Sequence, residues 1–115
     1  MHEMAIVQSV IDIVLQEMDR HGVEKLKAIH LAVGRMSAIV PEQMRMCFDI
    51  LTADHKLAGA ELNIRMVPVT YRCRNCDQEF TSEGITFKCP YCEGPDPDII
   101  FGRELKIESI EVMDE

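Results

Sequence analysis

The chain has 115 residues and a mass of 13.1 kDa, and 47% of its residues are hydrophobic while 28% are charged. This composition is typical of one globular domain with room for a small appendage, and it excludes a second full hydrophobic core. Twelve Lys and Arg against twenty Asp and Glu give a formal charge of −8, which argues against nucleic acid as a partner. We also expect no membrane partner, because no apolar run reaches the roughly 18 residues of a membrane span.

The first predicted element is an amphipathic helix over residues 4–21, where apolar side chains recur at steps of three and four positions. Glu3 suits its N-terminus and Gly22 suits its C-terminal cap, so we expect the helix to begin almost at residue 1. The following segment, residues 26–33, alternates like a strand and is apolar on both faces. This pattern predicts a central strand of a sheet.

Two further elements of the same fold follow along the chain. Pro41 opens a second predicted helix that runs to about Asp54, and residues 61–66 alternate like a half-buried strand. Residues 101–112 resume a strand pattern whose phase shifts at Ile110, which indicates a bulge or an exposed edge. A strand, helix and strand across residues 26–67 favour a crossover unit. The sequence therefore predicts an α+β fold, a small mixed sheet with two helices packed on it.

Four of the five cysteines form two C-x-x-C pairs, Cys73 with Cys76 and Cys89 with Cys92. Two residues between cysteines let one tight turn aim both sulfurs at a single ion, and two such turns complete a tetrahedral zinc site. The surrounding composition is turn-rich and lacks a long periodic run. We therefore expect a zinc-held domain at residues 70–100, inserted into a first domain formed by residues 1–69 and 101–115.

The predicted zinc is structural, because a site closed by four protein ligands leaves no position for a water nucleophile. A thioredoxin-like redox role is disfavoured, since Pro90 does not fit the helix that should follow such a motif. Residues 71–100 carry three basic and six acidic side chains, so this segment would repel phosphate. We interpret its four aromatic residues as a small core packed around the metal: Tyr71, Phe80, Phe87 and Tyr91.

The first three residues, Met1, His2 and Glu3, form a second candidate metal site. The terminal amine of Met1, the amide nitrogen of His2 and its imidazole Nδ1 can close two adjacent chelate rings in one plane. Glu3 is the natural fourth donor, and square-planar nitrogen sites select Ni(II) or Cu(II). The helix dipole opposes a cation here, but a deprotonated amide and Glu3 would offset that charge. Taken alone, such a terminus is more often a frayed end.

The remaining candidate ligands are interpreted as structural or solvated. His21 lies at the predicted helix C-terminus, where a cationic side chain suits the dipole, His30 lies on a strand face and His55 lies in a loop. Cys47 is interpreted as a buried small hydrophobe on the inner face of the second helix. An unpaired cysteine together with paired zinc thiolates suits a reducing compartment, and we expect the protein in the cytoplasm.

The combination of Met1-His2-Glu3, a strand ending at Val33-Gly34, and four cysteines ahead of a last strand resembles the HypA family of hydrogenase-maturation nickel metallochaperones. The resemblance covers essentially the whole chain. It implies a nickel-binding domain of two helices and a three-stranded sheet, with an inserted zinc-ribbon domain. It also implies Ni(II) bound at His2 with help from Met1 and Glu3, and structural Zn(II) at Cys73, Cys76, Cys89 and Cys92.

The same resemblance implies a carrier and not an enzyme. Its members deliver Ni(II), as transferable cargo, to the large-subunit precursor of [NiFe]-hydrogenase together with a HypB-type GTPase, and in some bacteria serve urease maturation with urease accessory proteins. Some relatives place a histidine beside a zinc cysteine as a pH or nickel switch. Here Asp77 and Glu93 follow the pairs, so we expect no such switch. The alternative is a zinc-ribbon adaptor for protein–protein interaction that carries no nickel.

Overall fold

The structure is a computed structural model that describes residues 3–113. Within these residues the chain forms two α-helices and six β-strands. Their order is α1 (Glu3–His21), β1 (Leu26–Gly34), α2 (Pro41–Thr52), β2 (Glu61–Val67), β3 (Val69–Arg72), β4 (Glu79–Ser82), β5 (Asp98–Phe101) and β6 (Leu105–Val112).

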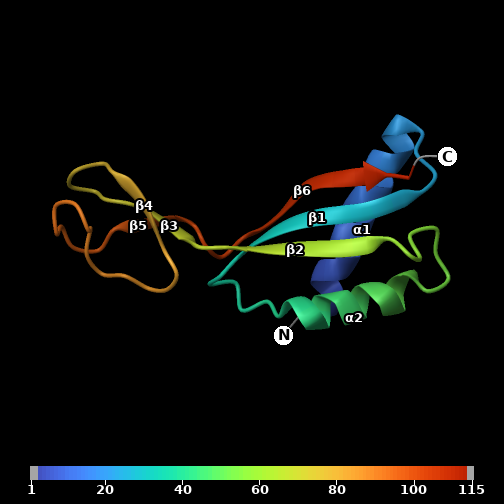
Figure 1. The fold of residues 1–115 in the computed structure, drawn as a ribbon, viewed down its shortest axis with the longest axis horizontal. Helices are drawn as coiled ribbons and strands as arrows, with labels where there is room; N and C mark the ends of the chain where they lie inside the picture. Colours follow the sequence, from blue (N-terminus) through green and yellow to red (C-terminus); the bar gives the residue numbers. More distant parts are fainter. Residues whose placement is uncertain (1–2, 114–115) are drawn as a thin grey trace. The chain divides into compact units, whose positions relative to one another are not determined.

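The first sheet has three strands in the order β2-β1-β6. Figure 1 shows β1 and β2 running in the same direction, connected through α2, while β6 runs the opposite way. The sheet is therefore mixed and contains the predicted crossover. The predicted central place of β1 and the predicted exposed edge at β6 are also confirmed, and each follows from how many apolar faces the strand presents.

The helices bury one stripe each, as the periodicity predicts. On α1 the buried side chains recur at the spacing of one helix face, and α2 buries Met44, Phe48 and Thr52. The two helices pack against each other. Gly22 adopts a φ of 65° directly after α1, the left-handed conformation expected of a C-terminal cap. The buried α1 stripe consists of Val7, Val10, Ile11, Val14 and Met18.

The second sheet was not predicted. It has the strand order β4-β3-β5 and both of its pairings are antiparallel. Each strand has four residues, too few to carry a recognisable alternation beside the cysteine turns. One prediction is wrong in detail, because Phe101 was assigned to the last strand but ends β5 and pairs with Thr70. A turn over residues 102–104 separates β5 from β6.

The chain divides into two compact units. The first consists of Met1–Leu31, Ile39–Arg65 and Lys106–Glu115, and the second of Ala32–Ala38 and Met66–Leu105. The short stretch after β1 joins the second unit through backbone hydrogen bonds, from Arg35 N to Val67 O at 3.0 Å and from Met36 N to Gly102 O at 2.7 Å. The predicted inserted domain of residues 70–100 stays a prediction, because it concerns which segments fold independently.

Neither helix in the described part of the chain is long and apolar enough to cross a membrane.

Candidate metal centre

The four paired cysteines are brought together by two turns of the same geometry. In the first turn Asp77 N donates to Cys73 O at 3.0 Å, and in the second Glu93 N donates to Cys89 O at 2.9 Å. Asp77 and Glu93 occupy equivalent positions, one residue after each pair, and both have positive φ, 65° and 61°. The two turns therefore present their sulfurs in the same way, as the repeated spacing predicts.

The sulfur positions fit a tetrahedral metal. All four Sγ atoms lie within 4.8 Å of one another. The Cys73–Cys92 Sγ separation is 3.5 Å and the Cys76–Cys89 separation is 3.7 Å. A tetrahedral shell with Zn–S bonds of about 2.3 Å requires sulfurs about 3.8 Å apart, whereas a disulfide requires about 2.05 Å. The four cysteines are free, and their spacing is that of metal ligands.

Backbone amides point at the sulfurs. Asn75 N and Cys76 N approach Cys73 Sγ at 3.3 and 3.4 Å, and Tyr91 N approaches Cys89 Sγ at 3.4 Å. A Cβ at Gly94 would lie 3.2 Å from Cys92 Sγ, so the chain passes close to the sulfur at a residue without a side chain. These N–H donors stabilise negative charge on sulfur, which a four-thiolate site concentrates in a small volume.

The thiols do not ionise equally. Hydrogen bonds from the Gly94 amide and the Asn75 side chain lower the pKa of Cys92 to about 6. At Cys76 the Gln78 backbone lowers the pKa, but desolvation and hydrogen bonds with the other three sulfurs outweigh it and raise the pKa to about 12. Four thiolates this close repel one another without a cation, so a bound divalent ion would allow all four to lose their protons.

A small aromatic core supports the centre. Tyr71 is buried, stacks on Phe80 with ring centroids 5.2 Å apart, and its hydroxyl donates to Gly84 O and accepts from Thr86 N, both at 3.0 Å. The interpretation of all four aromatic residues as a core around the metal is wrong for Phe87 and Tyr91, which are 71% and 65% exposed. The sheet of the second unit has only four-residue strands, and this small sheet shields the rings of Tyr71 and Phe80 but not those of Phe87 and Tyr91.

The proposed nickel ligands lie mostly beyond the described residues. Met1 and His2 fall outside the described range, and Glu3 is the first residue of α1. Glu3 is buried, with 6% of its surface exposed, and its Oε2 accepts no hydrogen bond from a described residue. The prediction of a nickel site at residues 1–3 stays a prediction. Sequence reasoning could not have found the burial of Glu3, because exposure at a chain end is the usual expectation.

Glu3 shares a hollow with Cys47. The α1–α2 hollow, as we call it, has a volume of about 440 Å³. The interpretation of Cys47 as a buried core residue needs correction, because its side chain is only half-buried and faces this hollow. The lining residues are Glu3, Met4, Gln43, Met46, Cys47 and Ile50.

The three described histidines have partners that account for them. His21 lies 3.5 Å from Glu17, His30 Nε2 lies 2.6 Å from Glu111 Oε1, and His55 Nδ1 accepts from Leu57 N at 3.2 Å. Within residues 3–113 the four paired cysteines form the metal-ligand cluster that the geometry supports, and no histidine joins it. These contacts agree with the interpretation of the three histidines as structural or solvated.

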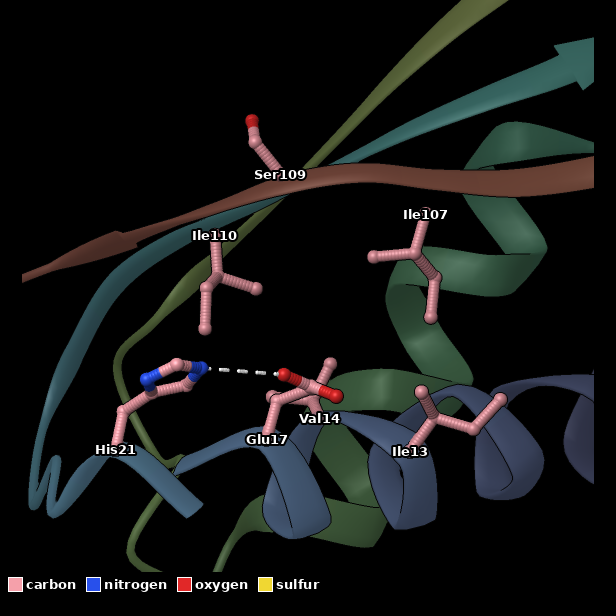
Figure 2. A pocket seen from close by; sticks show the side chains of 7 residues that line it. All are labelled: Ile13, Val14, Glu17, His21, Ile107, Ser109 and Ile110. Atoms are coloured by element: carbon pink, nitrogen blue, oxygen red, sulfur yellow. Dashed lines mark ion pairs between the residues drawn. The ribbon is translucent and has the colours of Figure 1, made fainter. Parts of the chain in front are cut away.

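A second hollow of about 240 Å³ lies between α1 and the edge strand β6. Figure 2 shows Ile107 and Ile110 pointing toward α1 while Ser109 points away, which is the phase shift expected in this strand. The Glu17–His21 ion pair lies at its rim (Figure 2). Glu17 and His21 pair with each other and most of the remaining lining is apolar, so we assign this hollow to the packing of helix on sheet.

Comparison with known proteins identifies the family. A family model described as "Hydrogenase/urease nickel incorporation, metallochaperone, hypA" matches residues 1–112. The chain belongs to the HypA family. It is similar to the hydrogenase maturation factor HypA of Solidesulfovibrio magneticus, with 41% identity covering 97% of this chain and 99% of that protein. The HypA of Desulfatibacillum aliphaticivorans is also 41% identical, over 99% of this chain and 88% of its own length.

Solved HypA structures share the fold. A solution structure of the Ni metallochaperone HypA from Helicobacter pylori matches all of this chain and all of its own, with a TM-score of 0.73 and 21% identity. A second solution structure of a HypA protein matches with a TM-score of 0.79 and 22% identity, covering 100% of this chain and 98% of that one. The predicted α+β fold class of this HypA family member is confirmed by both.

Proposed function

We propose that this HypA family member binds Ni(II) through Met1, His2 and Glu3 and delivers it for the maturation of [NiFe]-hydrogenase, and of urease where that enzyme is present. The family match to nickel-incorporation metallochaperones supports the cargo. The observation that supports the position is Glu3, a buried carboxylate whose Oε2 has no described partner, at the start of α1 and one residue from His2.

The proposed site suits a carrier. Two nitrogen donors from the terminus, an imidazole and a carboxylate make a planar ligand set for Ni(II), and a site at the end of a chain can exchange ligands with a recipient. The protein is proposed to bind and release its cargo without catalysing a reaction. Cu(II) binds such ligands more tightly than Ni(II), so selectivity must come from metal availability and from partners.

The partners proposed for delivery are a HypB-type GTPase, the large-subunit precursor of [NiFe]-hydrogenase, and urease accessory proteins. The net charge of −8 favours partners with a basic face and argues against nucleic acid. The cytoplasm is the proposed location, because thiolates such as these stay reduced there.

We assign Zn(II) to the four cysteines, as a resident structural ion. The donor set is all sulfur and the Sγ separations of 3.5 and 3.7 Å match tetrahedral coordination. Native mass spectrometry should find one zinc per chain that survives dialysis and is lost from Cys73→Ser. A purified wild-type protein without stable zinc would contradict the assignment.

The nickel proposal is tested by titrating Ni(II) into three zinc-loaded proteins: the native chain, His2→Ala, and a chain with residues added before Met1. We expect tight binding by the native chain alone, because the two changes remove the imidazole and the free terminal amine. Isothermal calorimetry gives the affinities. Equal binding by all three proteins would show that the cargo site lies elsewhere, or that the protein is a zinc-ribbon adaptor.

A further inference from the structure

The α1–α2 hollow combines features that core packing does not explain. Its lining from α2 consists of Gln43, Met46, Cys47 and Ile50. These positions follow the spacing i, i+3, i+4 and i+7, so they form one continuous face of the helix. This face is distinct from the buried stripe of Met44, Phe48 and Thr52, and it lies opposite the first turn of α1.

Glu3 places a buried carboxyl group in the hollow. Its side chain is buried, its Oε2 has no hydrogen-bond partner among the described residues, and none of the residues lining the hollow is Lys, Arg or His. Burying an ionised carboxylate without a partner costs several kcal/mol, so such a group is retained where a cation pairs with it. The helix dipole favours a negative charge at the start of α1, but it does not provide a hydrogen bond to the buried Oε2.

Cys47 supplies a second donor to the same hollow. Cys47 is free and half-buried, on the face of α2 that lines the hollow together with Glu3. Met4 and Met46 form an apolar but exposed rim of the hollow, so an ion can enter it from solvent. His2 is bonded directly to Glu3, and consecutive Cα atoms are about 3.8 Å apart. An ion that binds the Glu3 carboxyl group would therefore lie at this hollow.

We propose that Cys47 is a ligand of the Ni(II) cargo, binding through its thiolate together with Glu3. This inference rests on the function proposed above and adds to that site a sulfur donor from α2. The thiol proton is released to solvent when the Ni–S bond forms. The thiolate also supplies negative charge that opposes the repulsion between the ion and the α1 dipole. The ion then contacts both helices, and it is held more tightly than by a chain terminus alone.

The test uses Ni(II) and the zinc-loaded full-length protein, and it reads thiolate-to-nickel charge-transfer absorption together with calorimetric affinity. We expect the wild type to develop this absorption at one equivalent of nickel. Cys47→Ala should lose it and bind nickel at least about tenfold more weakly, since even outer-shell partners of a metal contribute that much. Wild-type absorption and affinity in Cys47→Ala would overturn the proposal.

Two controls separate the alternatives. Met46→Leu changes the same face of α2 but not the proposed ligands, so it should keep the absorption, and its loss there would mean that packing and not the thiolate is responsible. The zinc content of every sample is measured, because nickel that replaces zinc at the other four cysteines would also give thiolate absorption. An absorption that persists in Cys47→Ala arises from those cysteines and contradicts the proposal. If instead His2→Ala binds nickel like the wild type, the proposed N-terminal function fails while the Cys47 result stands as its own measurement.

Discussion

Gly34 shows how one residue without a side chain permits a close approach of two backbone segments. Its amide donates to Glu104 O at 2.9 Å, and a Cβ at this position would overlap the carbonyl of Gly102. The obstacle is backbone and not the flexible end of a side chain, so it cannot move without disturbing the pairing around it. The sequence identifies Gly34 only as the end of a strand, because the Gly102 segment is far away in the chain.

We therefore predict that Gly34→Ala destabilises the zinc-loaded protein by about 1–3 kcal/mol, the usual cost of overpacking. Urea unfolding followed by circular dichroism measures the change. The matched control is Gly84→Ala, since a Cβ at Gly84 meets no atom within 4 Å. If the two variants are equally stable, the close approach of Gly34 to Gly102 is absent in solution.

At the scale of elements, α2 begins without a side-chain cap. Its N-cap residue is Val40, which has the extended conformation of a cap, with φ of −104° and ψ of 112°, but makes no capping hydrogen bond. Val40→Ser should stabilise the protein by about 0.5–1 kcal/mol, because the serine hydroxyl can accept from a free amide of the first turn. Thermal unfolding compares it with Val40→Ala, which removes the same apolar surface without capping. Equal melting temperatures for the two variants would contradict the prediction.

The first sheet is crossed by an ion pair between its two edge strands. Arg65 on β2 donates two hydrogen bonds to Glu108 on β6, at 3.2 and 2.7 Å, although β1 lies between these strands. The Arg65 hydrogen bond is the main cause that lowers the pKa of Glu108. A carboxyl group whose pKa is lowered by folding stabilises the protein above its unfolded pKa, and this contribution disappears as the pH falls through the folded pKa.

Glu108→Gln should therefore be less stable than the wild type at pH 6 to 7, and the difference should shrink as the pH falls below about 4.3, the unfolded value. Urea unfolding at several pH values measures it. Because both side chains are substantially exposed, we expect the effect to weaken in high salt. A double-mutant cycle with Arg65→Met isolates the contribution of the ion pair. If the stability difference caused by Glu108→Gln is independent of pH both with Arg65 and with Arg65→Met, the ion pair is not its origin.

The helices and the strands of the first sheet could be predicted from the sequence because each is long enough to show its period. The predicted helix of residues 4–21 is α1 within one residue, and the central strand over residues 26–33 is β1. The four-residue strands of the second sheet carry no such signal, and their arrangement depends on the cysteine turns. The same limit applies to the site. C-x-x-C spacing locates the sulfur cluster, but the hollow that Glu3 and Cys47 share depends on how α1 and α2 pack.

For the whole molecule, the two units differ in what stabilises them. The first unit has a core of apolar side chains from α1, α2 and β1. Few residues between β3 and β5 are buried, among them Val69, Tyr71 and the proposed ligands Cys73 and Cys89. Structural zinc contributes roughly 10–16 kcal/mol, which is as much as the whole stability of an ordinary domain. The second sheet, β4-β3-β5, should therefore depend on the metal much more than the first unit does.

Removing zinc from the full chain with a chelator should consequently abolish hydrogen-exchange protection in β3, β4 and β5 while α1 and β1 keep most of theirs. Mass spectrometry of exchanged peptides measures both units in one sample, and adding one equivalent of Zn(II) should restore the protection. Cys92→Ser, which lacks a ligand, should behave like the chelated wild type without any chelator. Simultaneous loss of protection in α1 and β3 would mean that the chain folds as one cooperative unit, and it would contradict an independent zinc-held domain at residues 70–100.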